Sequence, residues 1–111
     1  MTWRRGDLVS VLAAGEYTAK ARPALIVQSS EAVALRDSVT VCLLTGELIE
    51  APAFRVRIKP ERDNGLRKTS DVMIDKLITI PKSAIVGSAF GKLSLAQLKD
   101  VDRALRFWLN L

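Results

Sequence analysis

Apolar side chains occupy consecutive positions in three segments of the first half of the chain. These segments are residues 7–12, 22–28 and 37–45, and the last two are rich in β-branched and aliphatic side chains. Residues 7–12 are predicted as a short, largely apolar strand, and the last two runs have the consecutive apolar positions expected for strands buried on both faces. Residues 29–36, which separate the second and third runs, are predicted to form a loop.

Residues 54–59 follow a different pattern, in which apolar and cationic side chains alternate strictly. Successive side chains of a strand point to opposite faces, so Phe54, Val56 and Ile58 are expected to face the core. The same alternation predicts a row of cations on the open face of the strand. This cation row consists of Arg55, Arg57 and Lys59.

The second half of the chain predicts a long strand and a helix. Residues 71–80 are predicted as one strand, or as two with a bulge between them, and residues 82–86 as one helical turn closed by Gly87. Further on, Ser94 and Gln97 have the spacing of a capping box. Apolar residues recur beyond it at helical spacing and form a stripe expected to pack on the sheet: Leu95, Leu98, Val101, Leu105, Trp108 and Leu109. The pattern predicts a mainly β (α+β) fold, a small, strongly curved antiparallel sheet or barrel with a long C-terminal helix.

The composition is that of a globular protein. The 111 residues are 49% hydrophobic and include only 6 glycines and 4 prolines, so we expect a single domain over residues 1–111. The first residues lack the pattern of a signal peptide, and no apolar run is long enough to span a bilayer. We therefore expect a soluble, cytoplasmic protein that does not contact a membrane.

The chain contains no histidine, and its single cysteine, Cys42, lies within an apolar segment. These absences exclude a histidine-based acid–base pair, a Ser-His-Asp triad and the ordinary zinc sites. No group of Asp and Glu residues has the spacing of metal ligands, so neither a metal nor another cofactor is expected. Any chemistry must use Arg, Lys, Asp, Glu, Ser, Thr or Tyr.

Most of the net charge of +5 comes from one stretch of the sequence. Between Ala51 and Lys68, six Arg and Lys side chains stand against two carboxylates, which gives +4 of the total. A localised basic stretch is an electrostatic footprint for a polyanion. A merely solvated face would account for the charge equally well.

Four segments, taken in order, resemble the MazF/PemK toxin family. They are Arg5-Gly6-Asp7-Leu8-Val9, residues 20–28 with Arg22-Pro23, residues 39–45 ending in Thr45, and residues 65–83. The resemblance covers nearly the whole chain. It implies an SH3-like barrel, a homodimer and a ribosome-independent, sequence-selective endoribonuclease that cleaves single-stranded mRNA. It also implies a cognate antitoxin protein that silences the toxin.

The resemblance also implies roles for individual residues. Arg22 matches the catalytic arginine of the family and Thr45 its catalytic threonine, and Asp75 falls where members carry an acidic residue implicated in the chemistry. Ser70 matches a serine that lines the RNA groove, and Thr69 beside it offers a second hydroxyl to phosphates or base edges.

Three departures from the family bear on which RNA sequence is cut. The loop at residues 13–19 is shorter than usual, although its Tyr17 is the best candidate to stack on an unpaired base. Gly46 follows Thr45 where many members carry Ser or Ala. Asp71 follows Ser70 where an apolar residue is common, which places a carboxylate close to a phosphate path.

The residues themselves suit cleavage of RNA, whose own 2′-OH is the nucleophile. An arginine fork such as that of Arg22 binds two phosphate oxygens and stays charged. Asp75 is the natural candidate to accept the proton of the 2′-OH. Structural roles remain open for each residue: Arg22 in a salt bridge with Asp75, Thr45 as an ordinary strand residue, and the hydroxyls as turn or cap partners.

Two other functions remain open at this stage. A non-catalytic SH3-like binding module would share the hydrophobic pattern. A gyrase-poisoning toxin of the same fold would act through aromatic residues near its C-terminus, and this chain ends in Phe107-Trp108-Leu109-Asn110-Leu111. The Arg-Pro-Ala-Leu-Ile-Val segment argues against the latter function.

Overall fold

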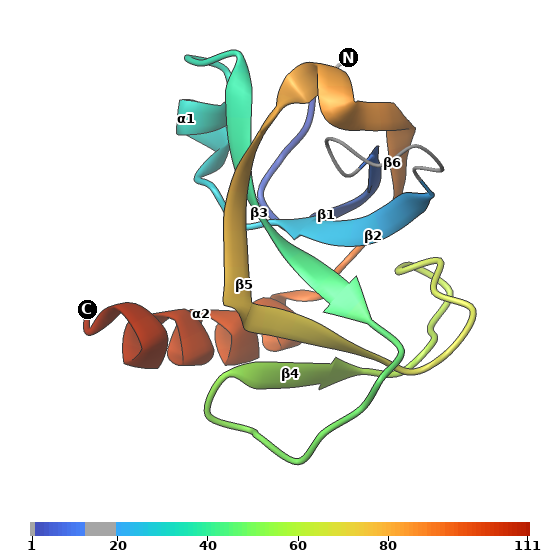
Figure 1. Ribbon diagram of the computed structural model, residues 1–111, viewed down its shortest axis with the longest axis vertical. Coiled ribbons are helices and arrows are strands. Elements are labelled where there is room, and N and C mark those ends of the chain that lie inside the picture. The colour runs from blue at the N-terminus through green and yellow to red at the C-terminus, as the bar shows by residue number, and fades with distance from the viewer. Residues whose placement is uncertain (1, 13–19) are drawn as a thin grey trace.

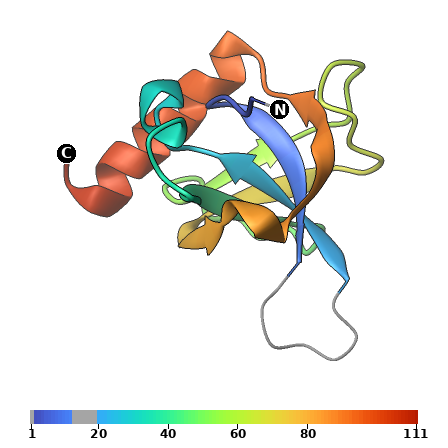
Figure 2. The same ribbon diagram turned by 90° about the horizontal axis from the view of Figure 1, so that it is seen from above.

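The computed structural model describes residues 2–12 and 20–111, in which six strands form one antiparallel sheet (Figure 1). The strand order is β4-β5-β3-β2-β1-β6, and the sheet curls into a small barrel-like shape (Figure 2). The strands are β1 (Asp7–Leu12), β2 (Ala21–Ile26), β3 (Ser38–Thr45), β4 (Arg55–Ile58), β5 (Ser70–Pro81) and β6 (Ile85–Lys92). The other elements are helix α1 (Ser30–Val33), the 3-10 turn η1 (Lys82–Ala84) and helix α2 (Leu95–Leu109). The predicted mainly β fold with a C-terminal helix is confirmed.

The first five strands begin and end within two residues of the predicted segments, whereas two elements differ from the prediction. Part of the predicted loop is α1, whose first turn is capped by Ser29 through a hydrogen bond from the backbone N–H of Ala32. The predicted turn at residues 82–86 is η1 followed directly by β6. Gly87, with φ of +70°, lies inside this strand and closes no helix. Pairing with β1 gives β6 its extended form, and sequence periodicity does not report such a distant partner.

Apolar clusters lie on both faces of the sheet, which explains the uninterrupted apolar runs. In β1, Leu8 belongs to one cluster and Val9 to the other, and in β2 Leu25 and Ala24 divide in the same way. Because strand side chains alternate between faces, a strand that supplies two cores needs apolar residues at consecutive positions. The prediction of strands buried on both faces is confirmed.

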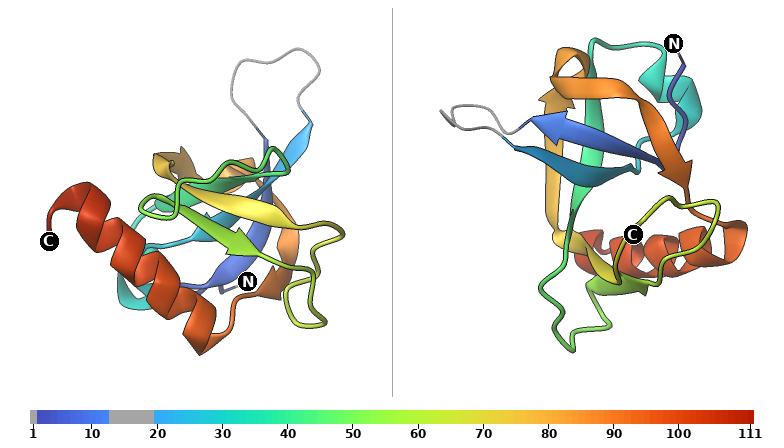
Figure 3. Two further views of the ribbon diagram at one scale, coloured as in Figure 1. Left: turned by 90° about the horizontal axis from the view of Figure 1, so that it is seen from below. Right: turned by 90° about the vertical axis from the view of Figure 1, so that its right-hand side faces the viewer.

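Helix α2 packs against β4 and β5 (Figure 3). Ser94 and Gln97 form the predicted capping box, with both of its hydrogen bonds present. The predicted apolar stripe is covered only in part, because just Val101 and Ala104 of α2 are fully buried. Leu95, in the first turn of the helix, is 80% exposed. In the described part of the chain, no helix combines the length and apolar character needed to cross a membrane.

Arg5 connects the beginning of the chain to this helix. Its Nε donates to the carbonyl of Val27 at 2.8 Å, and its Nη2 pairs with Asp102 of α2. These contacts fix β1, β2 and α2 relative to one another.

Candidate active site

Arg22 and Thr45, the predicted centre of the site, lie on the same face of the sheet. β2 and β3 pair antiparallel, and Ala24 opposite Leu43 is the last register pair at this end. Arg22 lies two residues before Ala24 and Thr45 two residues after Leu43, so both side chains point to the face that this pair shares. Arg22 near the start of β2 and Thr45 at the end of β3 therefore lie beyond the last register pair, toward the ends where Figure 1 shows the two strands diverging.

The guanidinium of Arg22 is available to a ligand. Arg22 is exposed, and no described residue forms an ion pair with it. It borders a cavity of about 390 Å³ with a mainly apolar lining that includes Leu12, Leu43, Ile78 and Ile80. An apolar wall strengthens the attraction between a cation and a bound anion because it excludes water from one side of the pair.

Thr45 ends β3 with its hydroxyl oriented by the next turn. Its Oγ1 accepts a hydrogen bond of 3.1 Å from the backbone N–H of Glu47. The oxygen is thereby held in place while the hydroxyl proton stays free to be donated to another group. Thr45 is thus equipped to donate to an anionic oxygen.

Asp75 does not form the salt bridge with Arg22 that the sequence left open. Its partner is Arg55 of β4, whose Nε and Nη2 lie 3.0 and 3.4 Å from the two carboxylate oxygens. The pair is largely buried, with the side chains of Arg55 and Asp75 13% and 19% exposed. Asp75 lies in the irregular part of β5, between the pairs Cys42–Leu77 and Leu44–Val72. Of the two forms that the sequence left open, the structure has one long strand, and the register with β3 shifts within it.

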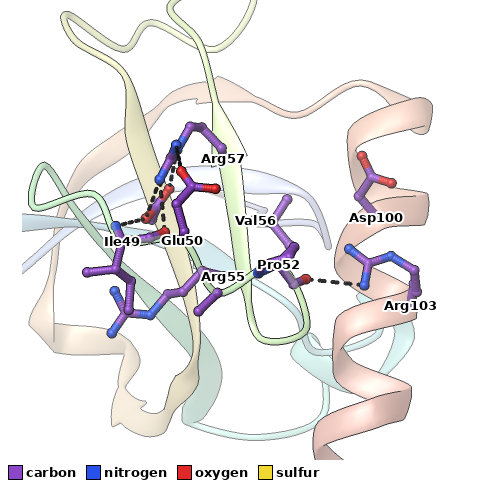
Figure 4. Close-up of a pocket in the computed structure, with 10 residues that line it drawn as sticks. Ile49, Glu50, Pro52, Arg55, Val56, Arg57, Asp100 and Arg103 are labelled. Carbon is purple, nitrogen blue, oxygen red and sulfur yellow. Dashed lines mark hydrogen bonds and ion pairs between the residues drawn. The ribbon is translucent and has the colours of Figure 1, made fainter.

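The alternation of β4 is confirmed, but its cation row does not present three free charges. Val56 and Ile58 are buried as expected. Arg55 pairs with Asp75, and Arg57 pairs with Asp71. Arg57 pairs also with Glu50, and both of these side chains are seen in Figure 4. Hydrogen bonds to the carboxylates of Asp71 and Glu50 raise the pKa of Arg57. Only Lys59 of the row makes no ion pair with a described residue.

The hydroxyl candidates lie at the start of β5. Ser70 is buried and its Oγ donates to the carbonyl of Lys68 at 3.1 Å, the local turn contact that the sequence left open. Thr69 is partly exposed beside it. Tyr17 lies outside the described residues.

The structure adds Lys68 to the site. A Cβ built on Gly46 would lie only 2.5 Å from Nζ of Lys68 and 2.6 Å from its Cε, so the lysine side chain lies against the Gly46 backbone. Lys68 makes no ion pair with a described residue. In the sequence Lys68 is only one of several basic residues, and the glycine after Thr45 was the sole signal of a close approach.

Cys42 is buried in the core beneath these residues. Burial raises the pKa of its thiol to about 12, with a smaller contribution from the carboxylate of Asp75. The thiol is therefore protonated at neutral pH and acts as a small apolar side chain, as its sequence neighbours predicted.

Solved toxin structures share this fold. The Mycobacterium tuberculosis toxin MazF-mt6 is similar with a TM-score of 0.79 and 25% identity, over 95% of this chain and 97% of that chain. The fold also matches an endoribonuclease in complex with its cognate antitoxin from a mycobacterial species, with a TM-score of 0.77 and 20% identity over 99% and 97% of the two chains. The class that the fold defines is therefore a small, mainly β domain with a C-terminal helix, of the kind that these solved structures have.

The family follows from sequence comparison. The family described as PemK-like, MazF-like toxin of type II toxin-antitoxin system matches residues 4–109. A Mycolicibacterium smegmatis protein named probable endoribonuclease MazF is 40% identical over 108 residues, which are 97% of each protein. The chain belongs to the PemK-like, MazF-like toxin family, and the resemblance seen in the sequence is confirmed.

Proposed function

We propose that this chain is the toxin of a type II toxin–antitoxin pair, a sequence-selective endoribonuclease that cuts single-stranded mRNA in the cytoplasm, independently of the ribosome. The observation that supports the proposal is that Arg22 and Thr45 lie on one face of the sheet, beyond the last register pair of β2 and β3. A cation and a hydroxyl donor at this point suit a phosphate. Membership of the MazF-like family supports RNA as the polymer that contains it.

The proposed reaction is an internal transfer at phosphorus. The ribose 2′-oxygen forms a bond to phosphorus while the bond to the 5′-oxygen breaks, which leaves a 2′,3′-cyclic phosphate and a 5′-hydroxyl. A base takes the proton of the 2′-OH, and the departing 5′-oxygen receives a proton. Because the nucleophile belongs to the RNA, the protein contributes mainly orientation and stabilisation of charge.

Each site residue then has a chemical role. Arg22 binds two non-bridging oxygens of the reacting phosphate, since its planar fork matches their geometry. Thr45 donates its hydroxyl proton to one of these oxygens as negative charge develops. Asp75 is the candidate base for the 2′-OH, and Arg55 orients its carboxylate.

The remaining contacts hold the RNA along its length. We assign Lys59 and Lys68 to backbone phosphates, because neither forms an ion pair with a described residue. Thr69 remains a predicted contact to phosphates or bases, and Tyr17 a predicted stacking partner. Ser70 stays a predicted groove residue whose hydroxyl must first leave the Lys68 carbonyl.

We further propose that the toxin is a homodimer that is silenced by an antitoxin protein. Leu12 and Ile78 are exposed large apolar side chains beside the Arg22 cavity, and a second copy would cover them. The mycobacterial endoribonuclease solved in complex with its cognate antitoxin supports an antitoxin partner for this chain.

Purified protein is expected to cut a long single-stranded RNA in the presence of EDTA. The sequence contains no histidine and no metal-ligand spacing, so the proposed reaction needs no divalent cation. The products should carry a cyclic phosphate and a 5′-hydroxyl, which end-labelling and mass spectrometry identify. Loss of cutting in EDTA, or a 5′-phosphate on the product, contradicts the mechanism. RNA binding without cutting supports a binding module, and cleavage of DNA that depends on added gyrase supports a gyrase poison.

Replacing Gly46 with alanine is expected to weaken RNA binding by displacing the Lys68 ammonium without removing it. Gly46 has no left-handed backbone conformation, so alanine fits the chain itself. Lys68→Gln should weaken binding as well and reduce the slope of log affinity against log salt by roughly 0.7. The double variant should bind RNA with the same affinity as Lys68→Gln, because the two changes remove the same contact.

The matched control for this loss of charge is Arg36→Gln. Arg36 precedes β3, whereas Thr45 ends it, and eight strand residues separate the two ends by about 23 Å. The control should bind RNA like the parent protein. Unchanged binding by both Gly46→Ala and Lys68→Gln would remove Lys68 from the site.

A further inference from the structure

Thr45 is one member of a row of three side chains that crosses neighbouring strands. Thr45 of β3 lies opposite Asp71 of β5, and Asp71 lies opposite Arg57 of β4. Register partners in antiparallel strands point to the same face, with Cβ atoms about 4.5–5.5 Å apart. The row therefore places a carboxylate beside Thr45 and a guanidinium beyond it.

Asp71 and Arg57 both form hydrogen bonds with the backbone of Ile49, in the loop that follows Thr45. Oδ2 of Asp71 accepts a hydrogen bond of 3.1 Å from the N–H of Ile49, and Nη2 of Arg57 donates to the carbonyl of Ile49 at 2.9 Å. The two side chains also pair with each other, Nε of Arg57 lying 3.0 Å from Oδ1 of Asp71. Asp71 is completely buried, so its charge is balanced by these contacts and not by water.

We propose that the Asp71–Arg57 pair is a positioning device for the cleavage reaction, which fixes the loop at residues 46–50 so that the Thr45 hydroxyl keeps its place. The inference rests on the proposed function of Thr45. The connection runs through the loop backbone, because Glu47 donates its N–H to Oγ1 of Thr45 and Ile49 is held two residues later. Asp71 and Arg57 act on the reaction through this loop without touching the RNA.

The charged pair performs a task that an apolar pair of the same size could not. Apolar side chains would fill the same volume on this face of β4 and β5, and apolar residues often stabilise a protein as well as an ion pair with a buried carboxylate does. They could form no hydrogen bond with the N–H or the carbonyl of Ile49. Loop position and protein stability are therefore separable by mutation.

The test compares two replacements of the pair with a control at the same guanidinium. Asp71→Asn keeps the shape of the side chain but weakens its hold on Arg57, so single-turnover cleavage should fall by about 10- to 100-fold. RNA affinity should stay within about threefold, since no phosphate contact is lost. Hydrogen exchange of the Ile49 amide should become faster, and that of Glu47 with it. The double replacement Arg57→Met with Asp71→Val should recover the melting temperature, because no buried charge is left alone, yet keep the slow cleavage.

Glu50→Gln is the matched control, since the Glu50 side chain also pairs with Arg57 but is 87% exposed and forms no hydrogen bond with the Ile49 backbone. Its cleavage rate should stay within about twofold of the parent rate, as expected for a surface ion pair. Recovery of cleavage together with stability in the double variant would overturn the proposal, because the pair would then be only structural. Unchanged exchange at Ile49 in Asp71→Asn would overturn it as well. This exchange measurement needs no RNA. It therefore distinguishes failure of the proposed positioning by the Asp71–Arg57 pair from failure of the proposed function.

Discussion

Replacing Arg22 with alanine is expected to leave a folded protein that binds RNA somewhat less well and hardly cuts it. The guanidinium is exposed and has no ion-pair partner among the described residues, so its removal leaves no buried charge behind. The variant lacks the positive charge that stabilises the negative charge developing on the phosphoryl oxygens. Arginines in this role contribute about a thousandfold or more to phosphoryl transfer. Single-turnover cleavage of a labelled RNA measures the loss.

Arg22→Lys separates charge from shape at the same position. An ammonium keeps the charge but cannot contact two oxygens through a planar fork, so this variant should also cut poorly. Thermal unfolding is the control, because a structural role would lower the melting temperature and leave the folded fraction active. A well-folded Arg22→Ala protein with near-normal cleavage would contradict the site and favour a binding function.

Thr45→Val is expected to slow cleavage by about a hundred- to a thousandfold, the usual cost of losing a hydrogen-bond donor to the transition state, or about 2.7–4 kcal/mol. Valine keeps the β-branched shape at the end of β3, so the packing is preserved. RNA affinity should change little, because the hydroxyl acts most strongly on charge that develops during the reaction. The rate constant at saturating RNA is therefore the informative measurement.

Thr45→Ser provides the matched comparison, since it retains the hydroxyl and removes only the methyl group. It should cut far faster than Thr45→Val even if it is the less stable of the two. Both variants also report on Glu47, whose N–H keeps its acceptor in the serine protein and loses it in the valine protein. Equal rates for the two variants would assign Thr45 a packing role.

Much of the fold could be predicted because local patterns and burial agree along most of the chain. The uninterrupted apolar runs of β2 and β3 reflect a sheet with a core on each face, and the capping box of α2 fixes where the helix begins. β6 escaped prediction because its sequence includes two glycines and few consecutive buried residues. Its extended form depends on β1, about eighty residues earlier, and no window of sequence contains both strands.

The sequence predicted which residues belong to the candidate site, but not which residues they pair with. Arg22 and Thr45 were named from the sequence, and the register of β2 with β3 places them on one face. Whether a charged side chain is free or forms an ion pair depends on the residues opposite it in the neighbouring strands. Arg57 looked like a free cation because alternation predicts direction but not partners, and the buried carboxylate opposite it belongs to a strand more than ten residues away. Ion pairs of this kind follow from register, which a bulged strand such as β5 conceals.

The pairing of β1 with β6, and of Arg5 with Asp102, has a consequence for how the toxin is made. β1 is synthesised first, but it can pair with β6 only after Lys92 has been added. Arg5 can pair with Asp102 only later still. At about 5–20 residues per second, a growing chain spends roughly 4 to 16 seconds with β1 unpaired on that side. During translation the nascent chain therefore lacks its complete sheet, although Arg22 and Thr45 have already been made. The complete sheet can form only once Lys92 has been synthesised, and the contact between Arg5 and α2 only once Asp102 has been added.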